Sequence, residues 1–133
     1  MKREGDLAVQ HVIAIVDDDE SLGEALSGLL RSFGYIVAVF HSAEEFLGSA
    51  FLTRTYCLIA DVHMPGMSGL ELYGRLGALG MPIPTIFITA RFDPGLRARA
   101  LSEGAKGYLS KPFSQEELLA CVRSALKEFD HKQ

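Results

Sequence analysis

Five short apolar runs, each followed by a stretch with helical spacing, constrain the fold of this chain more than any other feature. The runs occupy residues 11–17, 35–40, 56–61, 84–90 and 105–109, and β-branched residues are frequent in them. Runs that are apolar at nearly every position are typical of strands covered on both faces, as in a parallel sheet. The pattern predicts five βα units and an α/β fold.

The stretches between the runs have the spacing of amphipathic helices. Two stripes are strong: Leu22, Ala25, Leu26, Leu29, Leu30 and Phe33 form the first, and Leu118, Leu119, Val122, Leu126 and Phe129 form the second. Weaker patterns cover about 42–50, 68–79 and 94–103. Ser21 and Glu24 have the spacing of a capping box, and Gly34 stands where a glycine commonly ends a helix. Right-handed crossovers would place these helices on both faces of an open sheet.

Composition narrows the classes of function. The 133 residues are 48% apolar and 23% charged, with a net charge of −4, so nothing attracts nucleic acid or anionic lipid in bulk. No run is long enough to span a membrane, and no signal peptide is visible. Cys57 and Cys121 lack metal-ligand spacing, which predicts buried, reduced thiols in the cytoplasm. We expect one domain over 11–130 behind a flexible N-terminal tail at 1–10.

Polar residues follow four of the predicted strands at the points where the strands end. They are Asp17, Asp18 and Asp19 after the first run, Asp61 after the third, Thr89 after the fourth and Lys111 after the fifth. The carboxyl ends of parallel strands share one edge of the sheet, where sites form. Clustered carboxylates repel one another and need a cation, and Mg²⁺ suits hard oxygen ligands. With a lysine and a hydroxyl added, the pattern predicts a carboxylate nucleophile and a phosphoryl group.

Each of these residues alone has an ordinary structural explanation. Acidic residues favour the first turn of a helix, Asp61 could be a helix cap, and Lys111 could be a solvated surface lysine. Their joint placement at the ends of the correct strands is what supports the site.

Four motifs, in this order and spacing, resemble those of response-regulator receiver domains. They are IVDDDESL at 15–22, DVHMPGMSGLEL at 61–72, FITA at 87–90 and KGYLSKPF at 106–113. The resemblance extends from about His11 to Phe129 and is nearest to receivers joined to helix-turn-helix transcription regulators. It implies a flavodoxin-like, doubly wound (βα)5 sheet with strand order 2-1-3-4-5. The implied function is a phosphorylation-dependent switch, not an enzyme with turnover, that accepts its phosphoryl group from a sensor histidine kinase.

The resemblance also implies a role for each residue of the site. Asp61 matches the phosphoacceptor, and Lys111 matches the lysine that pairs with phosphoryl oxygens. Asp18 matches a direct ligand of Mg²⁺, for which Mn²⁺ could substitute, together with Asp61. Asp17 matches an acid acting through water, and the backbone carbonyl of His63 completes the metal shell.

The implied switch lies next to the site. Thr89 matches the hydroxyl that follows the phosphoryl group, and Tyr108 matches an aromatic residue that moves between outward and inward orientations. The face of the fourth helix, fifth strand and fifth helix would respond, serving a homodimer or an output domain. The domain itself would bind neither nucleic acid nor membrane. A cis peptide is expected at Lys111–Pro112.

His63 and Arg91 are the side chains best placed to tune the lifetime of the phosphoryl group. Arg91 could hold its oxygens and obstruct the attacking water, whereas neutral His63 could activate that water. The alternative, that both side chains point into solvent and do nothing, stays open.

Three other functions compete with the switch. One is a pseudo-receiver that is never phosphorylated and acts only as an interaction module. Another is a haloacid-dehalogenase-type phosphatase, which needs an acid at the position of His63. The last is a flavodoxin-like cofactor binder, which needs a phosphate loop where Asp17, Asp18 and Asp19 stand.

Overall fold

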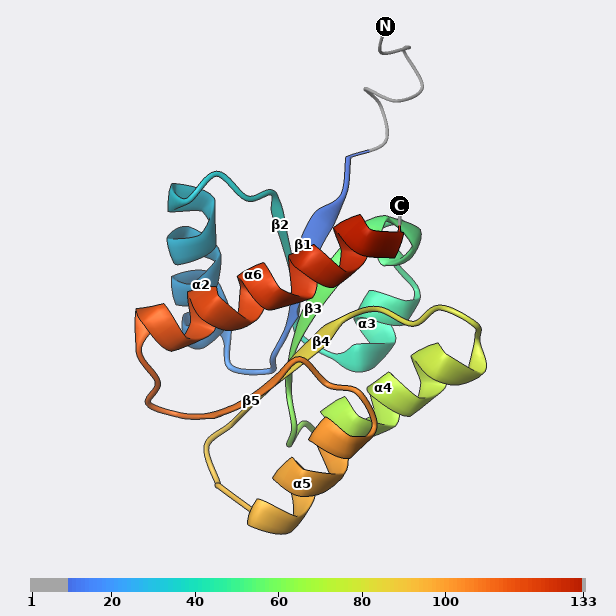
Figure 1. Cartoon of the computed structure of the whole chain (residues 1–133), viewed down its shortest axis with the longest axis vertical. Coiled ribbons are helices and arrows are strands. Elements are labelled where there is room, and N and C mark those ends of the chain that lie inside the picture. Colours follow the sequence, from blue (N-terminus) through green and yellow to red (C-terminus); the bar gives the residue numbers. More distant parts are fainter. Residues whose placement is uncertain (1–9, 133) are drawn as a thin grey trace, which may run out of the picture.

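The computed structural model describes residues 10–132 and contains one parallel sheet with the order β2-β1-β3-β4-β5 (Figure 1). The strands are β1 (Val12–Val16), β2 (Val37–Phe40), β3 (Thr55–Asp61), β4 (Thr85–Thr89) and β5 (Gly107–Ser110). The predicted flavodoxin-like, doubly wound α/β sheet is confirmed, with strand ends within about two residues of those expected. The predicted tail lies, except for Gln10, outside the described residues.

Helices cover both faces of this sheet (Figure 1). They are α2 (Glu20–Ser32), α3 (Ala43–Leu47), α4 (Gly69–Ala78), α5 (Pro94–Ser102) and α6 (Gln115–Lys132), with a short 3₁₀ helix, η1 (Leu52–Arg54), before β3. One core lies under α2 and α6, where Ile13 and Ile15 of β1 meet Leu30 and Leu118. The other lies under α3, α4 and α5. Because alternate residues of β1 enter different cores, all five are buried, which explains its continuous apolar run.

The start of α2 differs from the capping box predicted at Ser21. Asp19 is the N-cap, and its carboxylate accepts a hydrogen bond from the backbone N–H of Leu22 at 3.2 Å. The helix therefore begins before Ser21, which is exposed in its first turn. The apolar stripe is also narrower than predicted, since Ala25 is exposed and Phe33 is 51% exposed. Gly34 follows the helix with φ 91°, as the sequence indicates.

Both cysteines are free; Cys57 lies in the core under α6, and Cys121 of α6 packs against that core. Burial raises the pKa of the Cys57 thiol to about 12, and it also raises the pKa of Cys121, which is partly buried. Cys121 packs over Gly107 of β5, where a Cβ would lie 2.6 Å from its sulfur. Among the described residues, no helix is long and apolar enough to cross a membrane.

Candidate phosphoryl-acceptor site

The carboxyl ends of β1 and β3 and the residue after β5 bring three charged side chains together. Lys111 places its Nζ 3.2 Å from Oδ2 of Asp61 and 3.5 Å from Oδ2 of Asp17. Both carboxylates are buried, and the lysine side chain is only 21% exposed. The predicted convergence of Asp17, Asp61 and Lys111 at one edge of the sheet is confirmed.

Three carboxylates in this cluster are close enough to share one cation. Asp17, Asp18 and Asp61 each present an oxygen within 4.8 Å of the others, with Asp18 on the exposed side. The buried Oδ2 of Asp17 has an ion-pair partner in Lys111 but accepts no hydrogen bond. An oxygen-only ligand set with one exposed member and such an oxygen suits Mg²⁺, which keeps several waters.

Backbone N–H groups orient the two buried carboxylates. Oδ1 of Asp17 accepts from the N–H of Asp19 at 2.8 Å, and Oδ1 of Asp61 accepts from the N–H of His63 at 3.0 Å. In both residues this leaves Oδ2 facing Lys111. The side chains are therefore held in place before any ligand binds.

The first residue of α4 presses against the strand end that carries Asp61. The N–H of Gly69 donates to the carbonyl of Val62 at 3.1 Å, and a Cβ at Gly69 would collide with the backbone carbonyl oxygen of Asp61. Ser68 caps α4 through a capping box with Glu71. Sequence reasoning missed the need for glycine here, because the contact joins segments whose spacing depends on the tertiary fold.

A side chain of α3 holds the turn between β3 and α4. Glu44 accepts from the N–H of Met67 at 3.2 Å, and Gly66 beside it has φ 77°. A residue with φ in this range is favoured to be glycine. Glu44 is thus a supporting residue of the site that no motif in the sequence indicated.

The proposed switch residues take defined positions. Thr89 is fully buried; its hydroxyl donates to the carbonyl of Arg91 at 2.9 Å and accepts from the N–H of Arg91 at 3.1 Å. Tyr108 is only 7% exposed, so its ring is in the inward orientation. The side chains of His63 and Arg91 are exposed, and the Lys111–Pro112 bond is cis, as expected.

Comparison with known proteins decides the family. The model of the response regulator receiver domain matches residues 13–123. The chain belongs to the response-regulator receivers. Response regulator protein TmoT of Ectopseudomonas mendocina is 45% identical over an alignment of 132 residues that covers 95% of this chain and 60% of that protein. TodT of Pseudomonas putida is 47% identical over 116 residues, or 87% of this chain and 51% of that protein.

Solved receiver structures resemble this one closely. The response regulator StyR superposes with a TM-score of 0.85 at 39% identity, covering 92% of this chain and 62% of that one. FixJ-N superposes with a TM-score of 0.77 at 34% identity, covering 87% of this chain and 93% of that one. The chain spans about half to three fifths of the curated relatives it matches. Receiver domains act as phosphoacceptor switches, interact with sensor kinases and bind Mg²⁺ through acidic residues like those clustered here.

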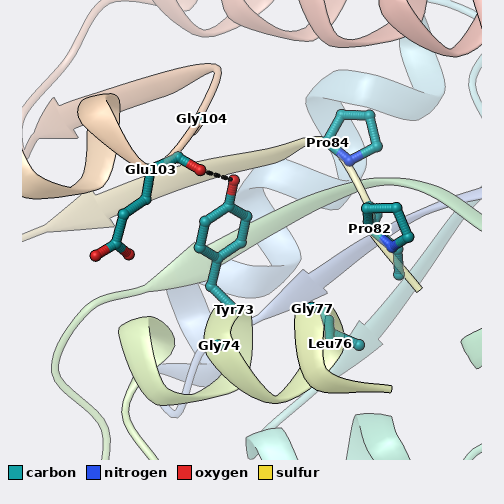
Figure 2. Close-up of a pocket in the computed structure, with 9 residues that line it drawn as sticks. Tyr73, Gly74, Leu76, Gly77, Pro82, Pro84, Glu103 and Gly104 are labelled. Carbon is teal, nitrogen blue, oxygen red and sulfur yellow. Dashed lines mark hydrogen bonds between the residues drawn. The ribbon is translucent and has the colours of Figure 1, made fainter. Parts of the chain in front are cut away.

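A cavity of about 300 Å³ lies at the opposite edge of the receiver's sheet (Figure 2). Its lining includes Gly74 and Gly77 of α4, Pro84 before β4, and Gly104 after α5. Figure 2 shows the Tyr73 hydroxyl pointing toward the carbonyl of Glu103, to which it donates a hydrogen bond at 3.0 Å. Pro84 stands just before β4, and Gly104 stands between α5 and β5. The cavity therefore lies at the amino ends of these strands, whereas the aspartate cluster lies at the carboxyl ends of strands.

Burial and charge repulsion act together on Asp17 of the receiver. Burial raises the pKa of this carboxyl, and the charge of Asp61 raises it further, whereas the Asp19 N–H and Lys111 lower it. The net result is a pKa of about 6 against an ordinary value of 3.8. Asp17 therefore keeps its proton to a higher pH than an ordinary aspartate does.

This shift predicts a pH-dependent loss of stability in the metal-free protein. The folded state binds more protons than the unfolded state between the two pKa values, so stability falls as pH rises from about 4 to about 6. Asp17→Asn cannot ionise at this position. As the pH rises from 4 to 7, we expect the free energy of unfolding of Asp17→Asn to rise by about 2 kcal/mol relative to that of wild type. Urea unfolding in EDTA at several pH values measures the difference. Parallel pH profiles of the two proteins would contradict this account.

Proposed function

We propose that this receiver accepts a phosphoryl group on Asp61 from a sensor histidine kinase. The observation that carries the proposal is the geometry of Asp61 itself. Its buried carboxylate lies 3.2 Å from Lys111 and within a 4.8 Å cluster with Asp17 and Asp18. One lysine faces two buried carboxylates, and a buried charge without compensation is costly, so the cluster favours a role in holding a cation.

The residues of the chain divide the work of the transfer. The His63 N–H orients the Asp61 carboxylate, which forms a P–O bond as the P–N bond of a phosphohistidine breaks and the histidine nitrogen keeps the electron pair. Lys111, freed from its contact with Asp61, pairs with a phosphoryl oxygen by a charge-assisted hydrogen bond. Asp18, Asp61 and the His63 carbonyl would hold Mg²⁺, with Asp17 acting through water. When bound, Mg²⁺ offsets the charge of the transferring oxygens.

An apolar groove beside Lys111 supports a kinase as the donor. It lies between α2 and the segment that joins β5 to α6, and has a volume of about 550 Å³. Its apolar lining is Leu22, Ala25, Leu26, Leu29, Pro112 and Phe113. A groove of this kind accepts the apolar face of a helix, and Lys111, which also lines the groove, would meet the phosphoryl group carried by that helix.

The test of the proposal is acceptance of a phosphoryl group from acetyl phosphate. The chain is incubated with acetyl phosphate and Mg²⁺, and the modified residue is mapped by mass spectrometry. We expect one acyl phosphate, on Asp61, that does not form in EDTA. A phosphoryl group on Asp17, Ser68 or a histidine would overturn the assignment. No labelling of the folded protein would favour the pseudo-receiver, and turnover of a phosphomonoester would favour the phosphatase.

The two acids after β1 should differ in their effect on the metal. Asp18→Ala is expected to weaken Mg²⁺ binding, and to slow phosphorylation, several-fold more than Asp17→Ala does. Asp18 is the exposed ligand, whereas Asp17 is buried and already has an ion-pair partner in Lys111. Titration of both variants with Mg²⁺, followed by NMR or by the rise in melting temperature, measures this order. Equal affinities would show that the two acids share one role.

The signal would spread through Thr89 to the face of α5, β5 and α6. To reach a phosphoryl group on Asp61, the Thr89 hydroxyl must leave the backbone of Arg91, which frees the segment before α5. The balance between two packings of this segment and of Tyr108 would then shift. This face would serve a homodimer or an output domain.

The lifetime of the phosphoryl group should depend on Arg91. We expect Arg91→Ala to shorten it several-fold, because the exposed guanidinium two residues after Thr89 would hold phosphoryl oxygens and obstruct water. The protein is loaded with labelled phosphate, the donor is removed, and decay is followed in wild type, Arg91→Ala and His63→Ala. Unchanged or slower decay in Arg91→Ala excludes shielding by that residue. A much slower decay in His63→Ala would instead assign His63 as the base.

A further inference from the structure

Phe92, between Arg91 and the N-cap of α5, makes an unusual contact for a surface residue. Its ring is 56% exposed, yet it packs edge-on against Tyr108, with 6.4 Å between ring centroids and an interplanar angle of 76°. Tyr108 also contacts Phe87 of β4, with 6.4 Å between ring centroids, and Phe87 contacts Tyr73 of α4 at 5.5 Å. A row of four rings therefore crosses this face of the sheet, with Phe92 as its exposed end.

Tyr108 is not held in its buried position by hydrogen bonding. Its hydroxyl is buried and has no hydrogen-bond partner among the described residues. Burying a hydroxyl without a partner favours the alternative in which the ring turns outward and the hydroxyl meets water. Packing must therefore hold the ring inward, and Phe92 is the exposed ring that packs against it.

Phe92 is also tied to the phosphoryl-acceptor site through its neighbour. Thr89 holds the backbone of Arg91 by two hydrogen bonds, at 2.9 and 3.1 Å, and Phe92 is the next residue. When the Thr89 hydroxyl turns away, both bonds are lost and the backbone that carries Phe92 loses its anchor. Movement at Thr89 would thus reach Tyr108 through one covalently connected segment.

We propose that Phe92 is a positioning residue that covers Tyr108, holds it in the buried orientation and couples that orientation to Thr89. The coupling to phosphorylation rests on the proposed function, whereas the covering of Tyr108 does not. Removing the ring should raise the outward population of Tyr108 roughly two- to tenfold, which corresponds to the usual strength of one aromatic pair.

The experiment uses the whole chain labelled with 3-fluorotyrosine, because its four tyrosines give few ¹⁹F resonances and it contains no tryptophan. Tyr108→Phe assigns the Tyr108 line. In Phe92→Ala, we expect this line to move toward its position in unfolded protein and to gain a larger H₂O/D₂O isotope shift. The lines of Tyr35, Tyr56 and Tyr73 should stay in place, which shows that the fold is intact.

Phe33→Ala is the matched control, since Phe33 is 51% exposed but lies at the end of α2. It should leave the Tyr108 line unchanged. An unchanged Tyr108 line in Phe92→Ala overturns the proposal, whatever the protein does with acetyl phosphate.

Phosphorylation of Asp61 is measured separately: its failure in wild type would overturn the proposed function and leave the covering of Tyr108 standing. Loss of the Tyr108 response to beryllofluoride in Phe92→Ala, with the response kept in Phe33→Ala, supports the coupling; an equal response in both overturns it.

Discussion

Asp61→Asn is expected to take up no detectable phosphoryl group from acetyl phosphate or a phosphorylated kinase. An amide is not a nucleophile toward phosphorus, and the variant also lacks the charge that Lys111 and the metal would share. The fold should survive, because Asn keeps the size of the side chain and an oxygen that can accept from the His63 N–H. Mass spectrometry of the intact protein and a melting curve measure both expectations.

Asp19→Asn is the control for this experiment. It also removes one carboxylate, in the segment after β1, but Asp19 is exposed and its side chain serves as the N-cap of α2. Asn caps a helix as well as Asp does, so stability should hold, and labelling should remain near the wild-type level. If Asp61→Asn were still labelled at wild-type rate, the acceptor would have to be another residue.

Gly69→Ala should be the most damaging single-methyl change near the site. Its Cβ would meet the backbone carbonyl of Asp61, which cannot rotate away as a side chain would. Either α4 or the end of β3 must shift, so we expect a loss of about 3 kcal/mol in the free energy of unfolding. Displacement of Asp61 should also slow phosphorylation of the protein that remains folded. Urea unfolding gives the first quantity and acetyl phosphate labelling the second.

Gly74→Ala provides the comparison within the same helix. A Cβ at Gly74 meets nothing within 4 Å, so only the intrinsic preference of the helix for alanine acts. This variant should be more stable than wild type by about 1 kcal/mol and should be phosphorylated normally. A Gly69→Ala protein as stable as Gly74→Ala would show that the contact behind Asp61 is easily relieved.

The sheet and most of the acceptor cluster could be predicted because both follow from local pattern and from one topological rule. β-branched runs buried on both faces became strands, and parallel strands deliver their final residues to a common edge. That rule brought Asp17, Asp61 and Lys111 together even though Asp61 and Lys111 are 50 residues apart in sequence. The identity of the strands was sufficient, and no detail of side-chain packing was needed.

The features that the sequence did not indicate are of two kinds. Some depend on a choice between local conformations of similar energy, and others depend on contacts between residues distant in the sequence. Asp19 and Ser21 both suit a helix cap, and only the position of the chain after β1 selects Asp19. The need for glycine at Gly69 and the support from Glu44 arise where separate helices meet the loop after β3. The orientation of Tyr108 balances packing against an unpaired hydroxyl, and no periodicity reports that balance.

The core position of the two native thiols has a practical consequence for spectroscopy. A thiol reacts with maleimides and similar reagents as the thiolate, and burial raises the pKa of both Cys57 and Cys121. A cysteine introduced on the surface, for example in place of the exposed Leu79, would therefore react first with such reagents. Fluorophores or spin labels can be attached at chosen points of the wild-type background, so that distances to the face of α5, β5 and α6 are followed in real time without first replacing the native cysteines.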